Sequence, residues 1–160
     1  MSTPPPPPSP SVPTRYRRAF ETARRAAQVA LERRTRLFRV VNEAYDKLDR
    51  KGSATSKMGH DVRLLGRLVR ASARRQYRQV PWRTLVYAVA GLIYFIAPLD
   101  AIPDALLVLG FVDDIAVVSA VVKALREDLQ AFERWEASWA VEAGPAQTAL
   151  PVSAPAPMDA

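Results

Sequence analysis

The sequence predicts an all-α protein, and two observations carry that prediction. Apolar residues recur at intervals of three, four and seven from Thr14 to about Asp49, a stretch without glycine or proline, and this is the pattern of an amphipathic helix. Seven of the 14 prolines lie in residues 1–14 and four lie after Gly144. We therefore expect disordered or polyproline-like tails over 1–14 and 143–160, with the folded part between them.

The charge is divided sharply along the chain. Residues 1–83 hold 20 Lys and Arg against 6 Asp and Glu, whereas residues 84–160 hold 3 against 10. Such a basic half is typical of a surface that meets phosphate, on lipid or on nucleic acid. The chain contains no cysteine, which excludes a disulfide framework and a thiolate metal site.

Two basic helices are expected before the apolar part of the chain. The first, with its linker, occupies 15–60, and the second runs over about Asp61–Gln79, with Asp61 as a possible cap and Pro81 at its end. One face of the second helix carries five arginines, at Arg63, Arg67, Arg70, Arg74 and Arg78. This stripe is either a lipid headgroup-facing surface or a solvated charged face.

Thirteen uncharged residues, Leu85–Ala97, follow Trp82 and Arg83. A helix from Trp82 to Ala97 would be about 24 Å long at 1.5 Å per residue, shorter than the roughly 30 Å hydrocarbon core of a bilayer. The segment could therefore be a buried core helix. Trp82 and Arg83 stand where interfacial anchors belong, directly after the arginine-rich stretch, and this favours a transmembrane or membrane-associated helix.

A second apolar stretch completes a predicted helical hairpin. It follows a proline-containing turn, and an apolar stripe at helical spacing continues from Ile115 to Trp139 through a charged region. We therefore expect a domain over 61–142 that contains an apolar hairpin and then an amphipathic C-terminal helix.

Four aspartates interrupt the apolar region: Asp100, Asp104, Asp113 and Asp114. One aspartate at the centre of a membrane costs about 2.5–3.5 kcal/mol, so the pair at 113–114 disfavours a plain second span. Asp113 could cap the last helix, and Asp100 or Asp104 the segment after the turn. The alternative is that the four carboxylates hold a divalent cation such as Mg²⁺ or Ca²⁺, although no recognised loop spacing is present.

No conventional enzyme motif stands out. His60 is the single histidine, and the chain shows no nucleophile–base arrangement and no phosphate-binding glycine loop. The sequence favours a non-enzymatic protein, with catalysis by paired carboxylates as the alternative.

The region around the predicted turn resembles a known family. The pattern YxxxPxDxIPD, followed by GxxDD, is matched by Tyr94, Pro98, Asp100, Ile102, Pro103, Asp104, Gly110, Asp113 and Asp114. It is similar to the YkvA-like family of small, largely bacterial proteins of unknown function. This resemblance implies an α-helical, membrane-associated domain without an assigned activity.

Two functional hypotheses follow. The first is a non-enzymatic module at the bacterial inner membrane, with its basic half on the cytoplasmic side, that binds anionic lipid and either a membrane-protein partner or a second copy of itself. The second is a cation-dependent site, catalytic or transporting, on the four aspartates. Nucleic-acid binding is less favoured because the basic half offers few exposed aromatic residues for stacking.

Overall fold

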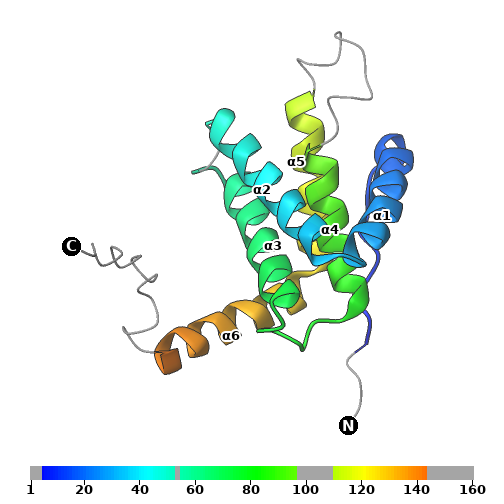
Figure 1. Ribbon diagram of the computed structural model, residues 1–160. Helices are drawn as coiled ribbons and strands as arrows, with labels where there is room; N and C mark the ends of the chain where they lie inside the picture. Colours follow the sequence, from blue (N-terminus) through cyan, green and yellow to red (C-terminus); the bar gives the residue numbers. More distant parts are fainter. Residues whose placement is uncertain (1–4, 53–54, 97–109, 144–160) are drawn as a thin grey trace, which may run out of the picture.

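The computed structural model describes residues 5–52, 55–96 and 110–143, with 110–115 and 143 described by their backbone only. Every regular element in these ranges is a helix, which confirms the predicted all-α class (Figure 1). The elements are the 3₁₀ turn η1 (Thr14–Tyr16), α1 (Arg17–Leu31), α2 (Arg34–Arg50), α3 (Lys57–Ala73), α4 (Trp82–Ile96), α5 (Gly110–Ala124) and α6 (Arg126–Ala143).

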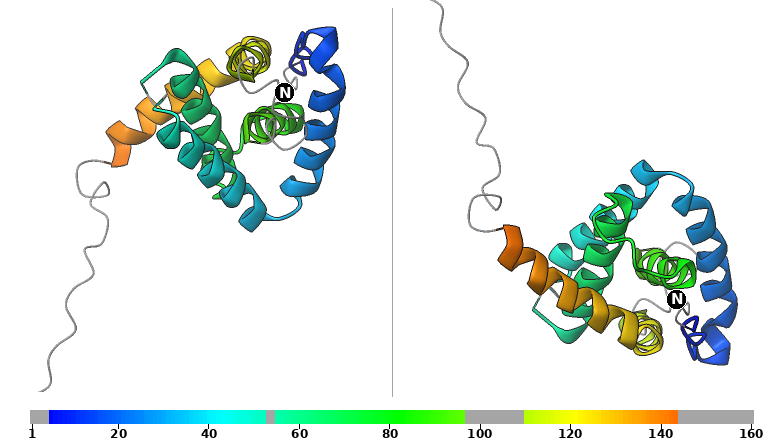
Figure 2. Two further views of the ribbon diagram at one scale, coloured as in Figure 1. Left: turned by 90° about the horizontal axis from the view of Figure 1, so that it is seen from above. Right: turned by 90° about the horizontal axis from the view of Figure 1, so that it is seen from below.

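Helix α4 lies at the centre of the bundle, where it contacts α1, α2, α3 and α5 (Figure 2). Ten of its 15 residues are buried, from Thr84 near its start to Phe95 near its end. A helix that is surrounded by other helices is apolar on all sides because each side faces protein. The position of α4 in the core thus accounts for its apolar character. This agrees with the first of the two interpretations given above, a buried core helix.

None of the described helices combines the length and the apolar character that crossing a membrane requires. Helices α4 and α5 do lie side by side, running in opposite directions (Figure 1). The predicted hairpin is therefore present.

The prediction of one helix from Thr14 to Asp49 is wrong. The chain breaks at Arg33, whose backbone is extended (φ −136°, ψ 119°), and α2 begins at the next residue. A single helix over this range would be about 50 Å long at 1.5 Å per residue, more than twice the length of α4. The break lets α1 pack on α4 while α2 packs on both α3 and α4.

The second basic helix begins and ends earlier than predicted. Ser56, not Asp61, is its N-cap, because the Ser56 hydroxyl accepts a hydrogen bond from the backbone N–H of Gly59 at 3.1 Å. The helix ends at Ala73, well before Pro81. Arg75 has a positive φ of 59°, and its N–H bonds to the Ser72 carbonyl while Gln76 N–H bonds to the Ala71 carbonyl. These two bonds form a Schellman motif, in which glycine is the usual residue at the position of Arg75.

The apolar stripe expected on one last helix is divided between α5 and α6. The chain bends at Leu125 and α6 runs across the end of the bundle (Figure 2). Aromatic contacts fix α6 there: Tyr77, from the segment after α3, lies with its ring centroid 5.3 Å from Phe132 and 5.0 Å from Trp135. The bend therefore allows α6 to pack against Tyr77.

Part of the proline-rich segment, which the sequence predicts as a disordered tail over 1–14, lies against the bundle, and Pro7 is its first buried residue. Val12 is buried in the core, and the Ser9 hydroxyl lies 3.2 Å from the Tyr87 hydroxyl of α4. The tail after residue 143 lies outside the described residues.

Candidate functional site

The described residues of the family pattern lie at the end of the bundle where α2 and α4 end and α3 and α5 begin, which we call the motif end (Figure 1). Tyr94 is buried in the last turns of α4, and α5 begins at Gly110. Five residues of the pattern lie outside the described residues: Pro98, Asp100, Ile102, Pro103 and Asp104. The four-aspartate cation site therefore stays a prediction.

Asp113 and Asp114 lie within the first five residues of α5. Because the helix already begins at Gly110, Asp113 is not its N-cap, and that prediction is wrong. The backbone still places both residues near the positive end of the α5 dipole, where a carboxylate is stabilising.

A buried lysine at the motif end was missed by the sequence analysis. Lys47 of α2 is only 5 % exposed, and its ammonium group donates to the backbone carbonyls of Phe95 and Ile96, the last two residues of α4. Its nitrogen also lies 4.8 Å from the centroid of the Phe95 ring. A cation is favourable at this position because helix C-termini carry partial negative charge and unpaired carbonyls. The sequence did contain a sign of this burial, because Lys47 follows Ala44 by three residues and therefore lies on the buried face of α2.

The arginine stripe of α3 is bound largely by the protein itself. Arg63 pairs with Asp49 of α2 at 3.4 Å, and Arg67 Nε pairs with Glu136 Oε1 of α6 at 3.0 Å. The bundle thus occupies two arginines that the sequence assigned to a headgroup-facing surface.

Two further arginines of the stripe lie over aromatic rings of α2. The Arg70 guanidinium is 4.8 Å from the centroid of Tyr45, and Arg74 is 5.7 Å from that of Phe38. Burial raises the pKa of Tyr45, although the positive charges of Arg70, Arg67 and Arg63 act in the opposite direction. The stripe therefore stabilises the contact between α2 and α3.

Unpaired basic residues gather at the opposite end of the bundle, where α1 and α3 end and α2 and α4 begin; we call this the Trp82 end. Two adjoining hollows of about 390 and 310 Å³ lie there, and they share Ser72, Arg75 and Leu85. Arg78 lines the first hollow, and Trp82, Arg34 and one acidic residue, Glu32, line the second. Arg34, Arg75 and Arg78 form no ion pair within the described part of the chain.

Trp82 is the most exposed tryptophan at this end, with 58 % of its surface accessible. The helices that begin beside it, α2 and α4, have no acidic residue in their first turns. Arg83 points elsewhere: it donates to the Tyr87 hydroxyl at 3.1 Å and lies 3.4 Å from the Ser9 hydroxyl. The Trp82 end therefore combines free guanidinium groups, two helix N-termini and an exposed indole.

Comparison with known proteins bears on the α4–α5 hairpin. Residues 84–120 match the family described as "Protein of unknown function (DUF1232)". A stretch of 53 residues is 40% identical to the "Uncharacterized membrane protein YkvA" of Bacillus subtilis (strain 168). The chain is therefore similar, over part of its length, to YkvA and to a family of unknown function. The resemblance predicted from the aspartate and proline pattern is thereby confirmed.

The match to the Bacillus protein covers 33% of this chain and 50% of that protein, so the chain spans about half the length of the relative it matches. No solved structure matches this chain. Among the described residues of the matched range 84–120, helices α4 and α5 contribute side chains to the core. Trp82 and the arginines of the Trp82 end precede that range in the sequence.

Proposed function

We propose that this protein is a non-enzymatic, membrane-associated module whose Trp82 end binds anionic lipid headgroups. The observation that carries the proposal is the group of three unpaired arginines, Arg34, Arg75 and Arg78, around the exposed Trp82. The headgroup-facing set proposed here differs from the stripe predicted from the sequence, because most of that stripe is engaged within the bundle.

The chemistry of the Trp82 end suits an anionic interface. Each basic side chain close to such a surface contributes about 1 kcal/mol of binding free energy. Tryptophan favours the headgroup level because its ring is apolar while its indole N–H needs a polar partner. The exposed N-termini of α2 and α4 add partial positive charge directed at the same side.

The name of the Bacillus relative, a membrane protein, supports the same proposal. We place the module at the cytoplasmic face of a bacterial inner membrane, because a basic surface beside anionic lipid is the arrangement found on that side. A membrane-protein partner, or a second copy of the chain, would then extend the contact.

Fluorescence of Trp82 tests the proposal. In the full chain with Trp135→Phe and Trp139→Phe, Trp82 is the remaining tryptophan of the three in the sequence. Vesicles that contain phosphatidylglycerol should shift its emission to shorter wavelength, because the indole leaves water, whereas pure phosphatidylcholine vesicles should not. Emission that is unchanged while the protein co-sediments with the vesicles would contradict the assignment of this end.

A pair of alanine variants provides the matched control. Trp82→Ala should weaken partition into phosphatidylglycerol vesicles at least tenfold, since burying a large apolar side chain is worth about 1.5–3 kcal/mol. Trp139→Ala removes a tryptophan that is 45 % exposed on α6, and it should leave partition unchanged. Equal losses in the two variants would mean that binding does not depend on Trp82 in particular.

A further inference from the structure

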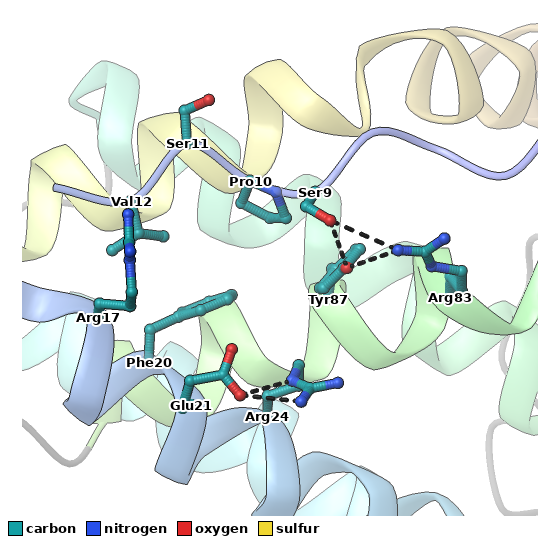
Figure 3. Close-up of a pocket in the computed structure, with 10 residues that line it drawn as sticks. All are labelled: Ser9, Pro10, Ser11, Val12, Arg17, Phe20, Glu21, Arg24, Arg83 and Tyr87. Atoms are coloured by element: carbon teal, nitrogen blue, oxygen red, sulfur yellow. Dashed lines mark hydrogen bonds and ion pairs between the residues drawn. The ribbon is translucent and has the colours of Figure 1, made fainter. Parts of the chain in front are cut away.

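A second basic pocket lies on another side of the bundle, between the N-terminal segment, α1 and α4 (Figure 3). Its volume is about 650 Å³. Ser9 to Val12 form one wall, α1 contributes Arg17, Phe20, Glu21 and Arg24, and α4 contributes Arg83 and Tyr87. It shares no lining residue with the hollows of the Trp82 end.

Three polar side chains converge on one side of this pocket (Figure 3). The Ser9 and Tyr87 hydroxyls lie 3.2 Å apart, and the guanidinium of Arg83 lies 3.1 Å from the Tyr87 oxygen. Burial raises the pKa of Tyr87, but hydrogen bonds with Ser9 and Arg83 and the charges of Arg83 and Arg24 outweigh it, so that this pKa is lowered. The surroundings of the Tyr87 oxygen therefore favour negative charge.

The charge of the lining is unbalanced. Arg24 pairs with Glu21 at 2.8 Å, whereas Arg17 has no ion pair within the described residues. Three arginines against one glutamate leave the pocket with a formal charge of +2. An anion that carries two charges would neutralise it.

The pocket also has an apolar floor. The rings of Phe20 and Tyr87 are stacked with their centroids 6.5 Å apart, and Val12 lies beside them. The group attached to an anion in this pocket therefore has an aromatic surface to cover.

We propose that this pocket binds a phosphate monoester, with the phosphate held by Arg24, Arg83 and the Ser9 and Tyr87 hydroxyls, while Arg17 adds positive charge to the lining. A phosphate monoester carries about −1.5 to −2 charges at pH 7, which matches the charge of the lining. Guanidinium groups suit its oxygens because their planar N–H groups can bind two oxygens at once. The ester group lies over Phe20 and Tyr87. This inference does not rest on the lipid-binding role of the Trp82 end.

Titration of the purified full chain with inorganic phosphate and with phenyl phosphate tests the proposal by calorimetry. Phenyl phosphate should bind more tightly, because its ring reaches the aromatic floor. Arg83→Gln should weaken binding of both probes about tenfold, since one charged hydrogen bond is lost. Tyr87→Phe retains the ring contact with Phe20 and removes one hydroxyl, and it should weaken binding about threefold.

Arg25→Gln is the matched control. Arg25 is an exposed residue of α1 and lines an adjoining surface hollow but not this pocket. It should bind both probes as the unaltered chain does. Equal weakening by Arg83→Gln and Arg25→Gln, or no binding by the unaltered chain at millimolar concentrations, would overturn the proposal.

Vesicles distinguish the two sources of a phosphate monoester. If the group belongs to a lipid, phosphatidic acid vesicles should bind more tightly than phosphatidylglycerol vesicles of equal charge, and Arg83→Gln should abolish the difference. If the ligand is soluble, calorimetric binding persists without that lipid preference. Phosphatidylglycerol binding without phosphate binding would overturn this inference and leave the Trp82 end unaffected.

Discussion

The two ends of the bundle use cations in opposite ways. At the motif end, the ammonium of Lys47 is buried and bound to backbone carbonyls at the end of α4. At the Trp82 end, the side chains of Arg34, Arg75 and Arg78 are exposed and form no ion pair within the described chain. A basic residue thus stabilises the fold at the motif end, whereas basic residues are available for a ligand at the Trp82 end. The net charge of the chain does not distinguish these two roles.

The arginine stripe of α3 connects the two ends. Arg63 and Arg67 lie in ion pairs with neighbouring helices, while Arg78, beyond the end of the helix, lines a hollow of the Trp82 end. The position of each arginine relative to α2 and α6, more than its place in the stripe, therefore decides whether it is free.

Replacing Lys47 should have the largest effect on stability. Lys47→Met keeps the apolar stem but leaves the carbonyls of Phe95 and Ile96 without their charged donor, so the free energy of unfolding should fall by about 2 kcal/mol. Arg50→Met, which removes an exposed charge from the same helix, should change it by less than about 0.5 kcal/mol. Urea denaturation measures both, and equal effects would show that the carbonyl contacts of Lys47 are not stabilising.

Arg75→Gly separates stability from binding at the Trp82 end. Arg75 adopts a φ of 59°, which is unfavourable for a side-chain-bearing residue and natural for glycine, so the variant should be more stable by about 1 kcal/mol. It also removes one basic group and should weaken binding to phosphatidylglycerol vesicles about fivefold. Thermal denaturation and vesicle sedimentation give the two values. A variant that loses both stability and binding would mean that Arg75 is needed for the fold.

The smallest effect is expected at Asp61, near the start of α3. Burial raises the pKa of its carboxyl above the ordinary value of 3.8, with Lys57 and His60 acting in the opposite direction. The folded state therefore holds this proton more tightly than the unfolded state, and stability contributed by protonated Asp61 is lost as pH rises through the folded pKa. Asp61→Asn should raise stability at pH 7 by a few tenths of a kcal/mol, and it should flatten the decline that begins near pH 3.8. An unchanged pH profile would exclude this role.

The sequence predicted the helical class, the α4–α5 hairpin and the family of that hairpin, because periodic apolar residues and the pattern around Pro98 are local signals. It did not predict the break at Arg33 or the end of α3 at Ala73, before Arg75. Neither site contains the glycine or proline that usually marks such a position, and both breaks depend on packing between helices.

The candidate site was only partly predictable for a related reason. A run of apolar residues is compatible with both a membrane and a protein interior, and the contacts of α4 decide which explanation applies to it. In the same way, the periodicity of α3 placed five arginines on one face, but the partners that engage Arg67 and Arg70 come from α6 and α2. Such partners are far away in sequence.

Vesicle co-sedimentation of two double variants tests the central claim most directly. Arg75→Gln/Arg78→Gln removes two unpaired charges from the Trp82 end, and it should weaken binding to phosphatidylglycerol vesicles by about 30-fold, at about 1 kcal/mol for each charge. Arg63→Gln/Arg67→Gln removes the same net charge from the paired part of the stripe, and it should weaken binding less than threefold. Equal losses in the two variants, or a larger loss in the second, would contradict the assignment of lipid binding to the Trp82 end.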